Sequence, residues 1–469
     1  MKNLFFLYSI ISFSLSQEIP IDFYAFDEYY VKLNSQKNIV NSSIFGLALY
    51  NNHIFPGKLD SIDIDTLDNR FNSTSYYRVG LDKMDSGFGI YGYYNFIFNK
   101  RFYVYLYPRI VNDPNLFNRY SGLARDNKRG GFNSGEVDVS GIGYKNKHGF
   151  IQIGRGRQGW GAGENTQLIL SYTSHSYEHV LMGFRFGKVQ TRYMHGFLES
   201  LDSGINRYIV AKGFEYNTDN SFAFGISEVV IYSGNNRPID FSYINPMSNH
   251  LEIEMNNRQN LSGTSNGNAV WEFSVNKNIN QNLLFSGNFI IDELVIDKIQ
   301  RDNGKSNGLG GSIRMLYRLP SKNKIINVFG SIIFIGTHTY RHENGGNNFV
   351  HRGQPLGIIH GSDFINYDIG LNVLGDKFFL KSKIGYIVKG SNSIENNPYL
   401  PYADYNVLPF PSGLTKKELY IFNKLRYKIK NKIIAKCEFL INSINSSTPS
   451  IDIKFGVNLY TDHLKIKKF

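Results

Sequence analysis

The chain has 469 residues, of which 42% are hydrophobic, and it carries a formal net charge of +12. After the N-terminus no run of about twenty apolar residues occurs, so the sequence does not predict a membrane-spanning helix. Its 36 Phe and 32 Tyr residues are typical of the aromatic girdles of membrane barrels.

Residues 1–16 have the pattern of a secretory signal peptide. Lys2 precedes the apolar residues 4–15, and the small Ser14 and Ser16 predict cleavage before Gln17. An exported basic chain does not meet nucleic acid, so its anionic partner would be lipopolysaccharide or an acidic polysaccharide. The alternative is that the basic side chains are solvated or contact lipid phosphates.

Residues 17–75 are predicted to be helical at first and irregular from residue 39 onward. Asp22 is placed to cap a helix that ends near Asn38. Apolar residues follow the i, i+3, i+4, i+7 spacing of one helix face, at Phe23, Phe26, Tyr29, Tyr30 and Leu33. The helix is too polar to span a membrane, so we expect it in the periplasm, against or inside the mouth of a barrel.

Residues 76–469 alternate apolar and polar side chains in successive runs, as in residues 451–459. Such alternation predicts strands with one apolar and one polar face. Every second gap is a tight turn of Asn, Lys, Gly and Asp, and the other gaps are longer, as in an outer-membrane barrel. The strands are predicted at residues 76–81, 89–99, 101–111, 136–144, 150–157, 180–186, 189–199, 208–216, 221–233, 269–276, 283–296, 309–319, 325–336, 364–374, 378–389, 416–429, 432–444 and 450–460.

We therefore predict an all-β fold, a transmembrane antiparallel β-barrel of about eighteen strands, an even number that returns both termini to the periplasm. The alternative is a soluble β-sandwich or a propeller, but no blade-length repeat is visible. The one cysteine, Cys437, cannot form an internal disulfide. It alternates with Ala435 and Phe439, which predicts a lipid-facing position.

The C-terminus has one feature of a barrel and one departure. Phe469 matches the terminal signal by which the barrel-assembly machinery recognises outer-membrane proteins. However, Lys467, Lys465 and His463 occupy alternate positions that should be apolar. We therefore expect the last strand to end near Tyr460, followed by a basic tail.

The densest motif is the glycine-rich stretch at residues 154–164, which is followed by residues 168–171, Leu-Ile-Leu-Ser. Arg155 and Arg157 occupy alternate positions at a strand end, so both are predicted to point into the lumen, where guanidinium groups hold carboxylates or phosphates. Trp160 lies among glycines, which suits a stacking platform for a sugar ring. Alternatively, the motif is a structural plug in which both arginines pair with acidic residues of the lumen.

This Gly-Arg…Trp-Gly-x-Gly…Leu-Ile-Leu-Ser stretch resembles the Wzi-type capsule-assembly outer-membrane proteins. The resemblance continues, in matching order, through residues 208–215, 227–232, 243–246, 292–293, 355–357 and 361–363. It implies an eighteen-stranded, occluded barrel that acts as a surface lectin and tethers capsular or other exopolysaccharide. The predicted N-terminal helix is similar to the periplasmic helical element of that family.

The candidate ligand-binding residues are charged or aromatic and lie in or near these motifs: Arg155, Arg157, Trp160, Glu164, Arg185, Glu228, Tyr232, Arg237 and Asp292. Of these, the three residues Arg155, Arg157 and Arg185 are predicted to form a charged network across the lumen. Glu228 and Asp292 are the acidic partners predicted for that network.

The long loops at residues 112–135, 234–268, 337–362 and 390–415 are predicted to bind an acidic polysaccharide, because arginine grips carboxylates and aromatic faces cover sugar rings. Their basic residues are Arg119, Arg125, Lys128, Arg129, Arg237, Arg258, Arg341 and Arg352. Their aromatic residues are Tyr120, Phe132, Tyr243, Tyr340, Tyr399, Tyr402 and Tyr405.

Two function classes stay open: a closed lectin barrel, and a porin or substrate-specific channel. An enzyme is not predicted, although Ser171 and Ser174 lie near three histidines and Glu199 in the sequence, as a Ser-His hydrolase would need. The sequence has no HExxH, CxxC or phosphate loop, and the histidines of residues 337–362 have no metal-site spacing. We therefore expect no metal and no cofactor, and a monomer that contacts outer-membrane lipid and lipopolysaccharide.

Overall fold

A computed structural model of the chain describes residues 26–35, 71–84, 87–99, 101–117, 119–146, 148–201, 204–218, 222–259, 267–296, 298–302, 306–401, 409–430, 432–443, 449–460 and 464–467. The predicted signal peptide lies outside these residues, as do residues 36–70 of the predicted N-terminal segment. Among the helices that these ranges contain, none is long and apolar enough to cross a membrane.

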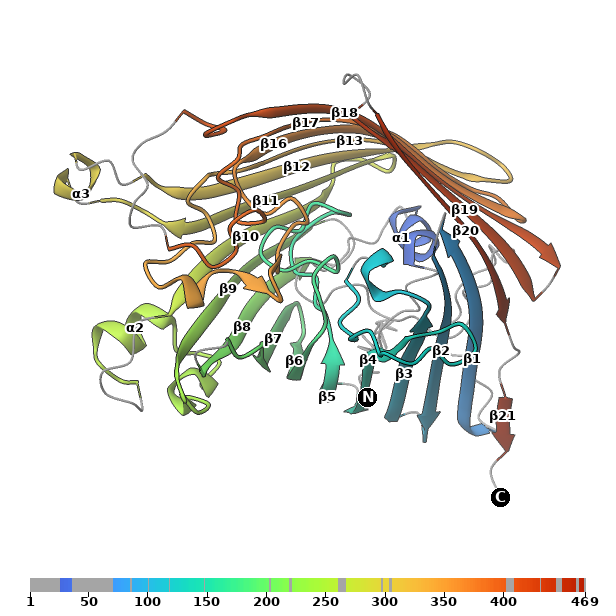
Figure 1. Cartoon of the computed structure of the whole chain (residues 1–469), viewed down its shortest axis with the longest axis horizontal. Coiled ribbons are helices and arrows are strands. Elements are labelled where there is room, and N and C mark those ends of the chain that lie inside the picture. The colour runs from blue at the N-terminus through green and yellow to red at the C-terminus, as the bar shows by residue number, and fades with distance from the viewer. Residues whose placement is uncertain are drawn as a thin grey trace, which may run out of the picture.

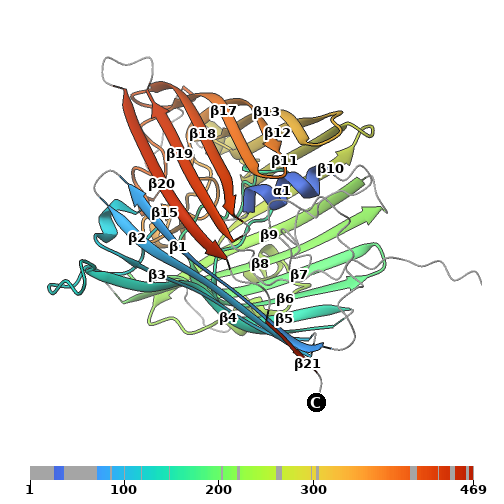
Figure 2. The ribbon, with the colours of Figure 1, turned by 90° about the vertical axis from the view of Figure 1, so that its right-hand side faces the viewer.

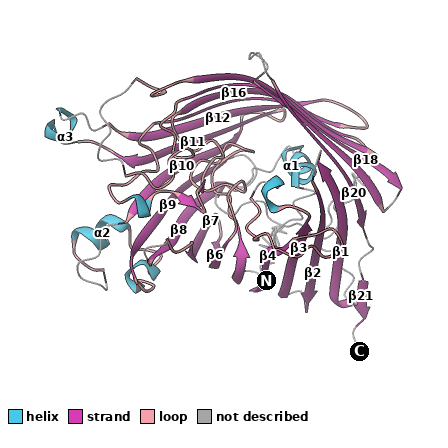
Figure 3. Cartoon of the chain, in the orientation of Figure 1, coloured by secondary structure: helices cyan, strands magenta, loops and turns pink. Residues whose placement is uncertain are grey.

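The strands of the described ranges form one antiparallel sheet that closes into an eighteen-stranded barrel (Figures 1 and 3). The strands are β1 (Phe71–Met84), β2 (Phe88–Phe98), β3 (Phe102–Val111), β4 (Ser134–Lys145), β5 (Gly149–Gly156), β6 (Tyr177–Phe186), β7 (Val189–Phe197), β8 (Ile205–Thr218), β9 (Phe222–Asn235), β10 (Asn268–Asn278), β11 (Leu283–Glu293), β12 (Gly308–Leu319), β13 (Ile325–Ile335), β16 (Phe364–Leu374), β17 (Phe378–Lys389), β18 (Lys416–Lys430), β19 (Ile433–Asn442) and β20 (Ser450–Tyr460). The predicted all-β barrel and its strand number are confirmed. The small strands β14 (Val350–His351) and β15 (Gln354–Pro355) pair with each other in the loop between β13 and β16.

The barrel closes where the first and last strands meet. β20 pairs with residues 78–84 of β1, and β21 (Leu464–Lys467) pairs with residues 71–75 of the same strand. β20 and β21 are thus two parts of one wall position, the eighteenth. The long strand β20 ends at Tyr460, as expected, but the basic tail that follows it also contributes to the wall, because β21 pairs with β1.

Side chains alternate between the two faces of the wall, because successive residues of a strand point to opposite sides. In β3, Phe102 and Val104 are exposed on the outer face, whereas Tyr103 is buried in the interior. Cys437 lies opposite the exposed Leu425 of β18, and residues directly opposite share a face. Cys437 therefore faces outward, as predicted.

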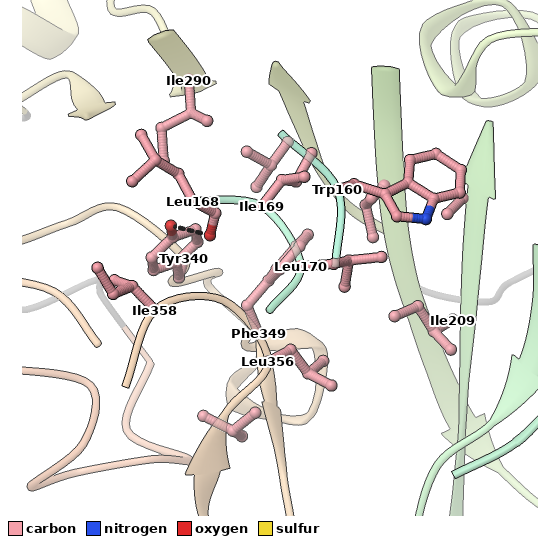
Figure 4. Close-up of a cluster of buried hydrophobic side chains, with 14 of the residues drawn as sticks. Trp160, Leu168, Ile169, Leu170, Ile209, Ile290, Tyr340, Phe349, Leu356 and Ile358 are labelled. Carbon is pink, nitrogen blue, oxygen red and sulfur yellow. Dashed lines mark hydrogen bonds between the residues drawn. The ribbon is translucent and has the colours of Figure 1, made fainter. Parts of the chain in front are cut away.

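The interior is filled mainly by the connection between β5 and β6, residues 157–176, which turns into the lumen (Figure 4). Trp160, Leu168 and Leu170 are fully buried there. They belong to one apolar cluster with inward side chains of the wall, such as Ile209 of β8. The Tyr340 hydroxyl donates a hydrogen bond of 2.6 Å to the Leu168 carbonyl, which ties the connection to the β13–β16 loop.

A second inserted element, α1 (Phe26–Ser35), also lies within the ring of strands (Figures 1 and 2). Its Val31 packs against Leu374 and Phe379, which flank the short turn between β16 and β17. Arg318, beside the short turn after β12, donates a hydrogen bond to the Asn34 carbonyl. These contacts place α1 at the end of the barrel that carries the short turns, which in such barrels faces the periplasm.

The connection between β9 and β10 takes the opposite course, over the outer face of the wall. It contains the 3-10 helix η3 (Phe241–Ile244) and the helix α2 (His250–Met255), which lies outside the ring of strands in Figure 1. Its Tyr243 and Ile253 belong to a buried cluster with Tyr208 of β8 and Tyr232 of β9. The wall is thus covered from outside at this place.

Candidate functional site

The inserted connection, residues 157–176, takes its shape from two glycines. Gly161 and Gly163 have φ angles of +114° and +80°, a region that favours glycine. A Cβ atom at Gly163 would collide with the hydroxyl of Thr166. The Asn288 amide of β11 donates hydrogen bonds of 2.8 Å and 2.9 Å to the carbonyls of Ala162 and Thr166, which fixes the tight turn against the wall.

Trp160 is a core residue of this inserted connection. Its side chain has no exposed surface, and its backbone amide donates a 3.0 Å hydrogen bond to the Leu170 carbonyl. The Arg192 guanidinium lies over the indole ring, 5.4 Å from the ring centroid, which is a cation–π contact. A sugar ring cannot reach the indole face unless the connection moves out of the lumen. The buried position of Trp160 therefore favours a structural plug over a stacking platform for a sugar.

Glu164 joins the two inserted elements. Its buried carboxylate lies 2.6 Å from Lys381 of β17 and 3.2 Å from Arg314 of β12. The same Lys381 ammonium lies 2.8 Å from the carboxylate of Asp27 in α1. Lys424 of β18 contacts Asp27 as well, at 2.6 Å. The lumen therefore holds a charged network. It links the β5–β6 connection to α1 by way of side chains that the wall strands direct inward.

Charge pairing also holds the start of α1. Burial alone would raise the pKa of Asp27, but the ammonium groups of Lys381 and Lys424 lower that pKa far below its ordinary value. The neighbouring Glu28 lies 2.6 Å from Arg426 and is fully buried, and burial outweighs this partner, so its pKa is raised. The two adjacent carboxyl groups thus respond to the same interior in opposite directions.

Arg157 pairs inside the barrel, as predicted. Its guanidinium contacts the carboxylate of Asp138 in β4. Asp138 also accepts a 2.8 Å hydrogen bond from the Ser176 hydroxyl and lies 3.4 Å from Arg109 of β3. Arg109 in turn contacts Glu136. These groups brace both ends of the inserted connection against β3 and β4.

Arg155 does not point into the lumen, and that expectation is corrected. Ile151 and Ile153 of the same strand are exposed on the outer face, and Arg155 shares their parity. Its guanidinium lies 2.9 Å from Glu178 of β6, whose side chain is 60% exposed. Arg157 departs from this alternation because β5 ends at Gly156 and the chain then turns inward.

The predicted network of Arg155, Arg157 and Arg185 with Glu228 and Asp292 does not form as one unit. Arg185 lies beside the short turn after β6, where its backbone amide donates a 2.8 Å hydrogen bond to the His148 carbonyl. Asp292 lies at the other end of the barrel and accepts a 2.5 Å hydrogen bond from the Tyr340 amide. Because these groups lie at opposite ends or on opposite faces of the wall, one lumen network cannot include them all.

Glu228, Tyr232 and Arg237 belong to the outer-face cover. Glu228 accepts a 2.7 Å hydrogen bond from the His250 ring of α2. The Arg237 guanidinium lies 4.7 Å from the Tyr232 ring centroid and 3.2 Å from Asp240, and all three side chains are buried. They hold the β9–β10 connection on the wall.

The long loops are joined at Glu199, which is not among the predicted ligand-binding residues. Glu199 accepts hydrogen bonds from Arg207 at 2.8 Å, from the backbone amide of Arg352 at 2.8 Å, and from Tyr399. The His351 ring lies 2.5 Å from the same carboxylate. Although burial raises the pKa of Glu199, the His351 hydrogen bond and the Arg207 charge outweigh it and lower that pKa to about 2. Glu199 is thus a junction between the loops after β7, β13 and β17.

Several loop residues predicted to contact a glycan are instead buried. Arg341 donates to the carbonyls of Asn392, Asn397 and Leu400, and Tyr340 is 1% exposed. Arg341 therefore ties the β17–β18 loop to the β13–β16 loop. Tyr402 and Tyr405 lie outside the described residues.

The β3–β4 loop presents a basic tip. Arg125, Lys128 and Arg129 are all exposed there. Arg129 and Phe132 exchange backbone hydrogen bonds of 2.8 Å and 3.1 Å, which close a tight hairpin through two glycines at positive φ. These three cations and the exposed Asp126 lie close together in the sequence at the long-loop end, so the tip keeps a net positive charge that attracts anions.

The two serines of the hydrolase alternative have hydroxyl partners other than a histidine ring. The Ser171 hydroxyl pairs with that of Thr173 at 2.9 Å, and Ser174 donates to the His175 carbonyl. Across the residues that the structure describes, no group of three or more His, Cys, Asp or Glu side chains is placed to hold a metal ion.

Comparison of the sequence with models of known protein families gives no match. A comparison with curated proteins gives none either. Among solved structures, the chain resembles Wzi of Escherichia coli with a TM-score of 0.59 and 12% identity, over 84% of this chain and 85% of Wzi. It also matches OprD of Pseudomonas aeruginosa with a TM-score of 0.45 and 9% identity, over 85% of this chain and 96% of OprD.

The chain is an outer-membrane β-barrel with a Wzi-like fold. Its exposed apolar side chains on β3, β12 and β16 therefore face lipid, and its short turns face the periplasm. Wzi itself is described as a carbohydrate-binding β-barrel involved in group 1 capsule assembly.

Proposed function

We propose that this barrel is a closed lectin that binds an acidic capsular or exopolysaccharide at the cell surface and does not conduct solutes. The observation that carries the proposal is the Glu164–Lys381–Asp27 network, which joins two inserted elements across the lumen. A channel needs an open path, whereas here both elements are bound to the wall by buried charges. Separating one partner of such a pair costs about 3–5 kcal/mol.

The basic tip of the β3–β4 loop is the proposed contact with the polymer. Arg125, Lys128 and Arg129 are exposed at the end of the barrel that carries the long loops. Arginine can bind a uronate or phosphate group with two parallel hydrogen bonds. The fold likeness to Wzi, a carbohydrate-binding barrel, supports a glycan as the ligand class.

Affinity on such a surface comes from repetition along the polymer. An exposed ion pair contributes up to about 1 kcal/mol, so a single repeat unit binds weakly. A polymer presents many units at high effective concentration, so its binding is stronger without any new contact. Exposed charges are screened within about 8 Å at physiological ionic strength, so salt should weaken the complex.

The test compares an acidic polysaccharide with its single repeat unit, at low and high salt, on the purified barrel. The variant Arg125→Gln/Lys128→Gln/Arg129→Gln should weaken polymer binding at least tenfold. A control with the same charge change, Arg101→Gln/Lys277→Gln/Lys322→Gln, alters exposed residues of the short-turn end and should leave binding unchanged. Equal loss in both variants would show that only net charge matters and would refute the basic tip as the site.

Conductance in planar bilayers separates the lectin from the channel. The closed lumen predicts no stable current through the wild-type barrel. A large, stable current that a small solute blocks would support the channel instead, whatever the result with polysaccharide.

A further inference from the structure

The connection between β9 and β10 has an apolar surface that the proposed function does not use. In the described part of this connection, residues 236–259, both helices and the residues beside them expose large apolar side chains. They are Ile239, Phe241, Ile244, Met247, Leu251 and Met255, with exposed fractions between 38% and 79%. On α2, Leu251 and Met255 are four residues apart and share one face, whereas Ile253 is fully buried against the wall.

The other side of this connection covers polar groups of the outer wall. Lys212 of β8 donates a 2.5 Å hydrogen bond to the Ser248 carbonyl, and Glu228 of β9 binds the His250 ring. His195 of β7 lies 2.9 Å from the Tyr232 hydroxyl, under the same cover. On β8, Lys212 has the same parity as Phe214, which is 39% exposed on the outer face. The polar groups thus occupy positions that would otherwise face lipid.

Their height along the wall agrees with this. Glu228 lies six residues from Phe222, where β9 begins at the short-turn end. With a rise of about 3.3 Å per residue and a tilt of about 40°, this is about 15 Å, and the apolar band of such barrels is about 25 Å tall. Glu228 and its register neighbour Lys212 therefore lie at the level of the hydrocarbon.

The charged side chains of the connection suit a medium of low dielectric constant, because each has a partner. Arg237 lies 3.2 Å from Asp240, and Glu252 contacts Arg258. Glu254 accepts hydrogen bonds of 2.8 Å from the Tyr243 hydroxyl and from the amide of Gly267. The outward surface carries the six apolar side chains together with exposed polar ones, which are Asn236, Asn245, Asn249, Asn256, Asn257 and the ion-paired Arg258.

From these observations we infer that residues 236–259 lie in the outer leaflet of the membrane, with the six apolar side chains against lipid acyl chains. The strands on either side of β8, β9 and β10 also expose apolar side chains on the outer face, Phe197 of β7 and Phe289 of β11. The segment covers polar side chains of the outer wall and presents an apolar surface to the membrane in their place. It is a membrane-embedded cover and takes no part in glycan binding.

Site-directed spin labelling tests the inference on the full-length barrel in phospholipid vesicles. In a Cys437→Ala background, the variants Met247→Cys and Met255→Cys carry a nitroxide label, one at a time. Oxygen concentrates in the bilayer and a nickel chelate stays in water, so the ratio of their relaxation effects reports the environment. Both labels should be relaxed several-fold more by oxygen than by the chelate.

Two matched positions calibrate the measurement. Ile369→Cys lies on the lipid-facing side of β16, where the native side chain is 71% exposed, and should give the lipid result. Leu123→Cys lies in the β3–β4 loop, where the native side chain is 84% exposed, and should give the aqueous result. If the labels at 247 and 255 behave like that at 123, the connection is an extracellular loop and the inference is wrong.

A second copy of the chain is the other possible occupant of this surface. In that case the labels would be shielded from both reagents, and spin–spin broadening between copies would appear at positions 247 and 255. That outcome also overturns the inference. Loss of the fold is excluded by heat-modifiable migration of each labelled variant, which an unfolded barrel does not show.

Discussion

Lys381 and Asp27 are separated by 354 residues in the sequence, and their charged groups lie 2.8 Å apart in the lumen. The ammonium of Lys381 also contacts Glu164 at 2.6 Å, so one wall residue holds an N-terminal helix and an internal connection together. One buried cation with two acidic partners therefore links the two inserted elements that close this barrel.

We predict that Lys381→Met destabilises the barrel by about 3–5 kcal/mol, because it leaves the carboxylates of Asp27 and Glu164 without this buried partner. The free energy of unfolding in urea, measured in lipid vesicles, would show the loss. The matched control, Lys377→Met, changes an exposed lysine of the β16–β17 turn and should stay within about 0.5 kcal/mol of wild type. Equal effects of the two substitutions would contradict the network.

The second prediction concerns acid and Glu199. Its pKa is lowered from 4.5 to about 2 in the folded protein. A lowered pKa stabilises the fold above the unfolded value, and the stabilisation is lost as the pH falls from about 4.5 toward 2. The contribution at neutral pH is on the order of 3 kcal/mol. Wild type should therefore exceed Glu199→Gln in unfolding free energy at pH 7, and the difference should shrink toward pH 3. A difference that does not depend on pH would rule out this ionised junction.

The third prediction concerns Gly163, whose φ is +80° and whose Cβ would collide with Thr166. Gly163→Ala should destabilise the barrel by about 1–3 kcal/mol and loosen the inserted connection. Gly130 has a φ of +59° and open space around the Cβ position, so Gly130→Ala isolates the backbone cost alone. Thermal unfolding in detergent should rank the two variants in that order; the reverse order would mean that packing around Gly163 is not tight.

The fourth prediction is that the barrel conducts once its interior is emptied. Replacing residues 158–175 and 26–35 by short Gly-Ser linkers removes both described inserted elements and keeps every wall strand. Ion current in planar bilayers should then appear where the intact barrel has none. As a control, the same replacement of α3 (Lys298–Asp302), which lies outside the ring of strands in Figure 1, should leave the barrel closed. Absence of current in the emptied barrel, with its heat-modifiable migration retained, would contradict the plug.

The wall could be predicted from the sequence because period-two alternation is a local signal. The predicted strand at 325–336 differs from β13 by one residue, and the one at 364–374 is identical to β16. At strand ends, the face of the wall to which a side chain points is harder to predict from the sequence. Ile151 and Ile153 already indicate that Arg155 faces outward, so that error could have been avoided. Nothing comparable marks Arg157, because its side depends on the turn after β5.

The interior was harder to predict because its contacts join residues far apart in sequence. Glu164 belongs to a recognisable motif, but its partners Arg314 and Lys381 lie on strands whose other lysines and arginines look similar in the sequence. The positions of Glu228 and Tyr232 are hard to predict from the sequence for another reason. They stand on the outer face, where a lipid-facing residue should be apolar, and only the folded β9–β10 cover explains them.

The seam between β1 and the β20–β21 pair has a consequence for assembly. The wall becomes a ring only when the last residues of the chain reach the first strand, and contacts so distant in sequence form slowly. Until that seam forms, the inner face of the sheet is open from the side as well as from the long-loop end. The β5–β6 connection follows the fifth of the eighteen wall strands in the chain, so most of its own anchoring strands precede the seam in sequence. The inner face can therefore receive this connection before the ring is complete.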